Sequence, residues 1–286
     1  MYPAQFEYHT AGTVKEAIDL LAKHKDEAKL LAGGHSLLPA MKLRLAQPKH
    51  LIDIGKVSGL AGVKEEGGTL VIGAMTTHYA IESSAVLKSK CPLLPEVAGH
   101  IGDPMVRNMG TLGGSLAHAD PAADWPAAVI ALGAELVAEG PKGKRTIKVD
   151  DFFKGLLTTA LAENEILTEI RVPACGANVK CAYAKFPHPA SRFAVVGVAA
   201  VLTMDGGKIG KASIGITGAG TKATRAKGVE AAIAGKPADA ASIQAAASSA
   251  AEGVDVQADL QGSVEYKQHL LRVFAKRAME AAAAKK

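Results

Sequence analysis

The chain has 286 residues, with 33 Lys and Arg against 28 Asp and Glu, so its formal net charge is +5. Hydrophobic residues make up 48% of it, which is enough to bury a sizeable core and too many for a disordered protein. Charges or glycines interrupt every apolar run well short of the ~18 residues that a membrane span needs. No transmembrane segment is therefore expected. The basic residues are scattered and aromatic side chains are few, so nucleic-acid binding is not expected either.

The first 55 residues predict a β-α-β-like unit. Thr13 is a candidate helix N-cap, and Glu16 follows three residues later, which is the spacing of a capping box. Further on, a short apolar run ends at Gly33 and Gly34, as is typical of a buried strand that enters a glycine turn. The predicted elements are a helix that begins after Thr13, a strand at 29–32, a short helix at 37–45 and a strand at 50–54.

The next segment, up to about residue 176, mixes strand-like runs with helical ones. Its alternating run at 165–172 predicts a strand, which Pro173 ends. The other predicted elements are a strand at 70–74, a helix at 92–101, a glycine turn at Gly113 and Gly114, and a helix at 122–132.

The remainder changes character after a cluster of Pro, Gly and Asn near 175–180. Asp205-Gly206-Gly207 predicts a hairpin between strands at 194–204 and 208–217. Alanine-rich helices are predicted near 222–234, 239–252 and 264–284. Strands followed by helices favour an α+β fold. We therefore expect one domain at 1–176, with lobes at about 1–55 and 56–176, and a C-terminal α+β domain at 177–286.

Two glycine pairs are the leading candidates for a binding site. Residues 32–36 read AGGHS and residues 111–115 read TLGGS. Glycine allows positive φ, so consecutive backbone N–H groups can point into one concavity and hold a phosphate. The hydroxyls of Ser36, Thr111 and Ser115 add further donors, so two such loops could clamp a diphosphate. Each pair alone is also explained by a simple turn, and this alternative stays open here.

Other polar motifs give weaker signals. Gly218 to Ala223 formally matches a dinucleotide fingerprint, but it follows a hairpin strand and lacks an acidic residue ~20 positions later, so we interpret it as a helix-entry turn. Five acidic and histidine residues lie close together in the sequence: His100, Asp103, His118, Asp120 and Asp124. Their spacing matches no familiar set of metal ligands, and aspartates beside prolines are typical of turns. No metal site is therefore expected.

Cysteine usage and the N-terminus bear on the compartment. The three cysteines, Cys91, Cys175 and Cys181, are odd in number and form no CxxC pair, so neither a disulfide framework nor a zinc or iron–sulfur motif is indicated. The first ten residues show no basic region followed by an apolar stretch, so no signal peptide is expected. We interpret the thiols as reduced and the protein as cytoplasmic.

Four segments together resemble a known family. They are AGGHSLLPAMKLRLAQPKHLIDI from Ala32, VIGAMTTH from Val71, the run from Asp103 through RNMGTLGGSLAHADPAADWPAA, and EILTEIRVP from Glu165. In this order they resemble the medium, FAD-binding subunits of the molybdenum hydroxylases, with the carbon monoxide dehydrogenases as the nearest branch. The resemblance implies a two-lobed FAD-binding domain of the vanillyl-alcohol oxidase type and a smaller C-terminal α+β domain.

The resemblance also implies which residues bind FAD. The two glycine segments match the pyrophosphate loops of the family, and Asp124 matches a helix-start aspartate on the ribose side. Lys185 and Phe193 match positions at the flavin ring, although Phe193 is often tyrosine in relatives and Ser115 is often asparagine. The full implied set is Ala32, Gly33, Gly34, His35, Ser36, Leu37, Ile101, Thr111, Gly113, Gly114, Ser115, Asp124, Leu167, Lys185 and Phe193.

The implied function is electron transfer rather than substrate chemistry, so no catalytic residue is expected. Family members work with a large molybdenum subunit and a small subunit with [2Fe-2S] clusters, and FAD passes electrons to an external acceptor. We expect a dimer of such heterotrimers, with carbon monoxide as the candidate substrate. The alternatives are a free-standing flavin oxidoreductase, the FAD subunit of an aldehyde, purine or other N-heterocycle dehydrogenase, and an interaction subunit that has lost FAD.

Overall fold

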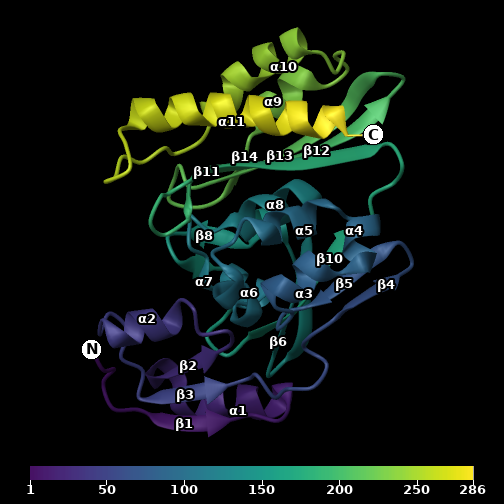
Figure 1. The fold of residues 1–286 in the computed structure, drawn as a ribbon. Helices are drawn as coiled ribbons and strands as arrows, with labels where there is room; N and C mark the ends of the chain where they lie inside the picture. The colour runs from purple at the N-terminus through teal and green to yellow at the C-terminus, as the bar shows by residue number, and fades with distance from the viewer. Residues whose placement is uncertain (286) are drawn as a thin grey trace.

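The computed structural model describes residues 1–285, and its first layer is a three-stranded parallel sheet with the order β1-β3-β2 (Figure 1). Thr13 caps α1 as predicted, while the Glu16 carboxylate accepts from the N–H of Gly12, one residue earlier than in a capping box. The sequence does not predict β1, because its residues are polar and largely exposed and only pairing with β3 holds them. The elements are β1 (Glu7–Thr10), α1 (Val14–His24), η1 (Lys25–Glu27), β2 (Ala28–Leu31), α2 (Leu37–Lys42) and β3 (His50–Asp53).

The second layer is a five-stranded antiparallel sheet with the order β4-β5-β10-β6-β7. Short helices pack on it around α8, whose nine residues are all buried. The elements are β4 (Val63–Glu66), β5 (Thr69–Gly73), α3 (His78–Ser83), α4 (Ala85–Lys90), α5 (Leu93–Gly99), α6 (Pro104–Met109), α7 (Leu112–His118), α8 (Asp124–Leu132), β6 (Glu135–Gly140), β7 (Gly143–Lys148), η2 (Val149–Asp151), β8 (Phe153–Gly155), β9 (Thr158–Thr159) and β10 (Ile166–Pro173).

The third layer is a four-stranded antiparallel sheet with the order β11-β12-β13-β14. Helices α9 to α11 cover its outer face and α8 packs on the inner one (Figure 1). Gly215 on β13 permits this packing, because a Cβ there would overlap the carbonyl oxygen of Ala127 on α8. The elements are β11 (Val179–Pro187), β12 (Ala194–Asp205), β13 (Lys208–Thr217), β14 (Thr224–Arg225), α9 (Lys227–Ile233), α10 (Ala240–Ala247), η3 (Ser248–Ala251) and α11 (Val264–Ala284).

Most of the predicted elements are confirmed, and two turn predictions are wrong. Gly113 and Gly114 lie inside α7 rather than in a turn. The segment from Gly218 leads into β14 instead of a helix, because Thr224 and Arg225 pair with β13 before α9 begins. None of the helices between residues 1 and 285 combines the length and apolarity needed to cross a bilayer.

Candidate functional site

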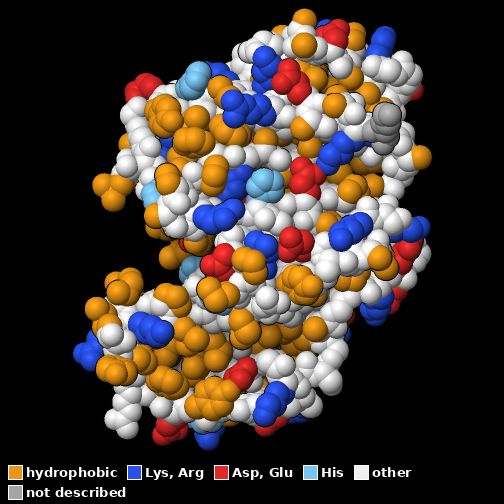
Figure 2. Space-filling view, viewed as in Figure 1, with side chains coloured by type: hydrophobic (Ala, Val, Ile, Leu, Met, Phe, Trp, Pro, Cys, Tyr) orange, Lys and Arg blue, Asp and Glu red, His pale blue; other side chains and the backbone are white. Residues whose placement is uncertain are grey.

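A cavity of about 800 Å³ lies between the first sheet and the rest of the molecule. Figure 2 shows the molecule hollowed at its left edge, above the N-terminal sheet. Both glycine segments line the cavity. Phe193, which directly precedes β12 and is 42% exposed, also lines it. All residues of the predicted set except Lys185 line it: Ala32, Gly33, Gly34, His35, Ser36, Leu37, Ile101, Thr111, Gly113, Gly114, Ser115, Asp124, Leu167 and Phe193.

The first glycine segment follows β2 and offers free backbone donors. Within residues 1–285, the N–H groups of Gly33, Gly34, His35 and Ser36 meet no protein acceptor. Gly34 has φ of +75°, so glycine is needed there for the backbone turn. Successive free N–H groups beside a cavity form a concavity that attracts an anion.

Gly33 serves a different purpose from the one that the sequence suggests. Its φ is not positive, and a Cβ there would overlap the carbonyl oxygen of Met109. The missing side chain therefore lets the end of β2 approach the connection between α6 and α7. The two segments also approach each other at Gly114, because a Cβ added there would lie 3.3 Å from the Cβ of Ala32. The two glycine segments are thus neighbours in space, although they are far apart in the sequence.

The second glycine segment begins a helix. Thr111 caps α7, and its Oγ1 accepts from the N–H of Gly114 at 3.1 Å. The N–H of Gly113 donates to the carbonyl oxygen of Ala74 at 2.8 Å, and a Cβ at Gly113 would overlap the Ala74 side chain. These donors are already used inside the protein. The N–H of Ser115 also donates inside the protein, to the carbonyl oxygen of Thr111 at 3.1 Å, so its hydroxyl is the donor that this residue can offer to the cavity that it lines.

Asp124 stands at the start of α8 in a buried polar network. Its Oδ1 accepts from the Tyr183 hydroxyl at 2.5 Å, and its Oδ2 accepts from Lys185 Nζ at 2.8 Å. Lys185 also donates to the carbonyl oxygen of His100 at 3.0 Å, and only 1% of its side chain is exposed. Lys185 therefore lies behind Asp124 and not in the cavity lining. Its position on β11 links the C-terminal sheet to α8.

Burial dominates the electrostatics of this network. Burial raises the pKa of the Asp124 carboxyl, and the charge and hydrogen bond of Lys185 oppose that rise. Burial and the neighbouring carboxylate raise the pKa of Tyr183 well above its usual value, so its hydroxyl stays protonated and donates to Asp124. A carboxylate oxygen accepts more than one hydrogen bond. Asp124 therefore retains acceptor capacity toward the cavity.

The cavity also contains residues that the sequence does not single out. His78 is buried at its edge, and burial lowers the pKa of His78 to about 4. Trp125 Nε1 donates to His78 Nδ1 at 3.0 Å, which fixes a neutral ring. Arg192, with φ of +61°, precedes Phe193 in the β11–β12 connection and brings a cation to the cavity. No local pattern marks either residue, because only the tertiary fold places them there.

The aspartates interpreted as turn residues are confirmed in that role. Asp103 caps α6 by accepting from the N–H of Val106 at 2.9 Å. The Oδ1 of Asp120 accepts from the N–H of Ala122 at 2.8 Å, although Asp120 also lines the cavity. Both carboxylates therefore stabilise local backbone, as expected for aspartates beside prolines.

Comparison with known proteins identifies the family. Residues 4–175 match the model described as FAD binding domain in molybdopterin dehydrogenase, and residues 181–282 match the CO dehydrogenase flavoprotein C-terminal domain. The chain belongs to the FAD-binding medium subunits of the molybdenum hydroxylase family. This medium subunit is therefore an oxidoreductase component, and its cofactor is FAD.

Individual relatives cover the medium subunit from end to end. The carbon monoxide dehydrogenase medium chain of Hydrogenophaga pseudoflava is 44% identical over 99% of this chain and 98% of its own length. The carbon monoxide dehydrogenase medium chain of Afipia carboxidovorans is 38% identical over 100% of this chain and 99% of its own length. A structure of the Hydrogenophaga pseudoflava enzyme superposes with a TM-score of 0.97 at 46% identity, covering 99% of both chains. The structure of quinoline 2-oxidoreductase from Pseudomonas putida 86 superposes with a TM-score of 0.93 at 32% identity, covering 99% of this chain and 98% of that chain.

The cavity of the medium subunit fits FAD by its own chemistry. The free N–H groups from Gly33 to Ser36 suit an anionic pyrophosphate, and Asp124 suits the hydroxyls of a ribose. Apolar side chains such as Ile101, Leu167 and Phe193 supply an environment for an aromatic ring. When bound, FAD supplies two-electron redox chemistry, and the protein binds and orients it.

Proposed function

We propose that this medium subunit holds the FAD pyrophosphate at Gly33 to Ser36 and at Ser115, and that Asp124 accepts from the ribose. Phe193 lies beside the flavin ring, and Lys185 acts through Asp124 as a positioning residue. The observation that carries the proposal is the row of free N–H groups from Gly33 to Ser36 beside a cavity that the second glycine segment also lines.

A pair of nearly isosteric substitutions at Ser36 tests this phosphate site. The Ser36 side chain stands directly before α2 and forms no capping hydrogen bond there, so we expect its replacement to leave the fold intact. Ser36→Asp puts a negative charge next to the pyrophosphate, while Ser36→Asn adds similar volume without charge. At ~5 Å and an effective dielectric constant of ~20, the repulsion is roughly 3 kcal/mol. We expect FAD affinity, measured by calorimetry, to be at least tenfold lower for the Asp variant than for the Asn variant.

Equal FAD affinities in the two variants would mean that the pyrophosphate does not bind at this segment. Circular dichroism and the thermal midpoint of each FAD-free variant provide the control for folding. Ser115→Asp and Ser115→Asn form the matching pair for the second segment, and we expect the same order of affinities there.

We further propose that the subunit works beside a large molybdenum subunit and a small iron–sulfur subunit in a complex that oxidises carbon monoxide. Its relatives at 44% and 38% identity are medium chains of carbon monoxide dehydrogenases, which supports this substrate. Relatives at 34–35% identity include the medium subunit of nicotine 6-hydroxylase and the medium chain of glyceraldehyde dehydrogenase. We therefore keep an N-heterocycle or an aldehyde as the alternative substrate.

Reconstitution separates these proposals. The FAD-loaded chain alone should show no bleaching of its flavin under carbon monoxide, while the chain with both partner subunits should reduce a dye. Turnover of the complete complex with nicotine or glyceraldehyde, but not with carbon monoxide, would contradict carbon monoxide as the substrate. Flavin bleaching of the isolated chain by substrate would overturn the division of labour among subunits.

Assembly and location complete the proposal. We propose a dimer of heterotrimers, for which the native mass should equal two copies of each subunit; a mass of one copy of each contradicts it.

We propose domains at 1–176 and 177–286, which the gap between the two family models at residues 175 and 181 supports. The three free cysteines favour a reducing cytoplasm, because an oxidising compartment promotes disulfides.

A further inference from the structure

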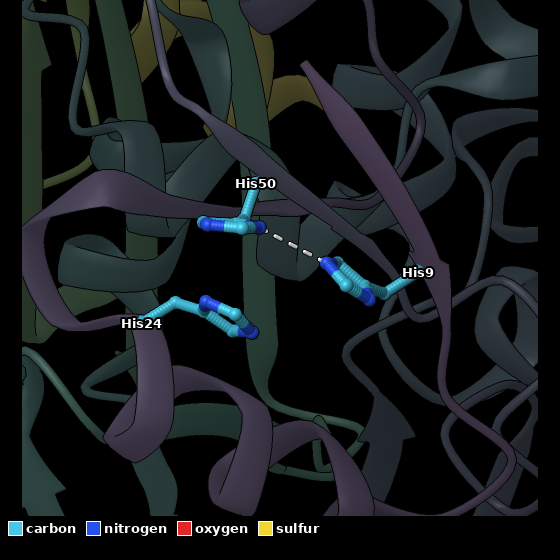
Figure 3. Close-up of side chains that lie close together, drawn as sticks. All are labelled: His9, His24 and His50. Atoms are coloured by element: carbon cyan, nitrogen blue, oxygen red, sulfur yellow. Dashed lines mark hydrogen bonds between the residues drawn. The ribbon is translucent and has the colours of Figure 1, made fainter.

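Three histidines from separate elements of the first lobe converge at one point (Figure 3). His9 lies on β1, His24 ends α1, and His50 begins β3. One nitrogen of each ring lies within 4.8 Å of the corresponding nitrogens of the other two. None of the three lines the FAD cavity.

The sheet register explains why these side chains meet. In the parallel pairing of β1 and β3, Glu7 stands opposite His50, and His9 follows Glu7 by two residues. Residues two apart on a strand point to the same face, so all three side chains lie on one face of the sheet. The last turn of α1 adds His24 to this group, as Figure 3 shows.

The distances suit a shared cation. His9 Nε2 and His50 Nδ1 share a hydrogen bond of 3.1 Å (Figure 3), and this separation is close to the roughly 3.4 Å between two nitrogens that each bind a tetrahedral zinc ion at ~2.0–2.1 Å. The His24 ring lies against the His50 ring, with ring centroids 3.6 Å apart and the ring planes tilted by 33°.

The state of His24 favours a ligand over a structural stack. Among residues 1–285, its Nε2 is buried without a hydrogen-bond partner, which costs free energy unless a ligand is supplied.

A carboxylate stands beside two of the three rings, those of His9 and His50. Glu7 Oε2 lies 3.4 Å from His50 Nδ1 and 3.9 Å from His9 Nε2, and the Glu7 side chain is 73% exposed. Three imidazoles and one carboxylate are four ligands, the number that zinc binds tetrahedrally. The exposure of Glu7 also leaves the site open to solvent, so an ion can enter.

We propose that His9, His24 and His50, with Glu7 as the fourth ligand, form a binding site for a divalent transition-metal ion of the zinc class. The ion ties the end of α1 to the starts of β1 and β3, on the lobe whose β2 carries the first glycine segment. The site is therefore structural, and it is separate from the cavity between the lobes.

Zinc titration of the FAD-loaded full chain tests the site. After chelation and desalting, calorimetry with Zn²⁺ should give one ion per chain. His24→Gln and His50→Gln should each lower the zinc affinity at least a hundredfold while FAD content stays the same. His269→Gln changes an exposed histidine on α11 and should leave the affinity unchanged. Zinc should also raise the thermal midpoint of the parent chain and of His269→Gln, but not of the two site variants.

Glu7→Gln keeps the test decisive if a histidine variant fails to fold, because Glu7 is exposed and its loss leaves the lobe intact. We expect weaker zinc binding in this variant as well. Absence of stoichiometric zinc uptake by the parent chain would overturn the proposal. Uptake that persists unchanged in the site variants would also overturn it, because the ion would then bind elsewhere, for example at the cysteines.

Discussion

Removing the carboxylate of Asp124 should destabilise the protein as well as weaken FAD binding. Only 6% of the Asp124 side chain and 1% of the Lys185 side chain are exposed, and the two groups are 2.8 Å apart. Asp124→Ala leaves the Lys185 ammonium buried with the His100 carbonyl oxygen as its remaining acceptor. Loss of one partner of a buried pair costs about 3–5 kcal/mol, so an FAD effect measured on this variant alone would mix folding with binding.

A double-mutant cycle separates the two effects. Asp124→Asn, Lys185→Met and the double variant are unfolded by urea without FAD, and the fluorescence of Trp125, the single tryptophan of the chain, follows the transition. Trp125 is fully buried in α8 next to Asp124, so it reports on this region. We expect each single variant to lose about 3 kcal/mol or more, and the double variant to lose about 2–3 kcal/mol less than the sum.

Two results would refute this reasoning. Additive effects in the cycle would mean that Asp124 and Lys185 do not stabilise each other. Losses below about 1 kcal/mol in the single variants would mean that the network is solvated in solution. FAD affinity then isolates the ribose contact: Lys185→Met keeps the carboxylate and should bind FAD more tightly than the double variant, by about 1–3 kcal/mol.

Two further predictions concern packing and pH. Gly33→Ala forces a methyl group against Met109 and should lower the free energy of unfolding by about 1–3 kcal/mol. Gly155→Ala, where a Cβ meets open space, should change it by less than about 0.5 kcal/mol; equal urea midpoints for the two variants would contradict the contact. The pKa of His78 is about 4 in the folded protein against 6.5 for a free side chain, so the unfolded state binds more protons between these values. Stability should fall by about 1.4 kcal/mol per pH unit as the pH drops through this window, and His78→Gln should remove that part of the slope; an unchanged slope would implicate another group.

Local patterns in the sequence account for the elements that were predicted well. The helix predicted at 264–284 has the same bounds as α11, because Ser263 caps it and its apolar side chains recur at helical spacing. The hairpin around Gly206 and Gly207 forms because both residues adopt positive φ between two strands rich in β-branched side chains. In both cases the information lies within neighbouring residues.

The elements and roles that were missed depend on distant partners. The edge strand β1 consists of polar residues, and pairing with β3 determines its conformation. Gly113 indicates a turn by residue type, but the approach of α7 to Ala74 is what requires a glycine there. The resemblance predicts Lys185 at the flavin ring, and this stays a prediction; the bond of its ammonium to Asp124 is a partner that the sequence does not reveal. Residue type and spacing do not reveal which partner a side chain meets across two sheets.

The start of α8 shows why the cavity depends on the C-terminal sheet. The Thr217 hydroxyl lies 2.7 Å from the carbonyl oxygens of both Pro121 and Ala123 and donates its one hydrogen between them, and the N–H of Gly218 donates to the carbonyl oxygen of Pro121 at 2.7 Å. The same short segment precedes Asp124, which Lys185 binds from β11. The third sheet thus fixes the backbone that presents Asp124 to the cavity, while the first sheet presents the free N–H groups of the glycine segment. Because neither sheet contains both sets of groups, the FAD site that we propose depends on both of them, and the C-terminal sheet is part of it.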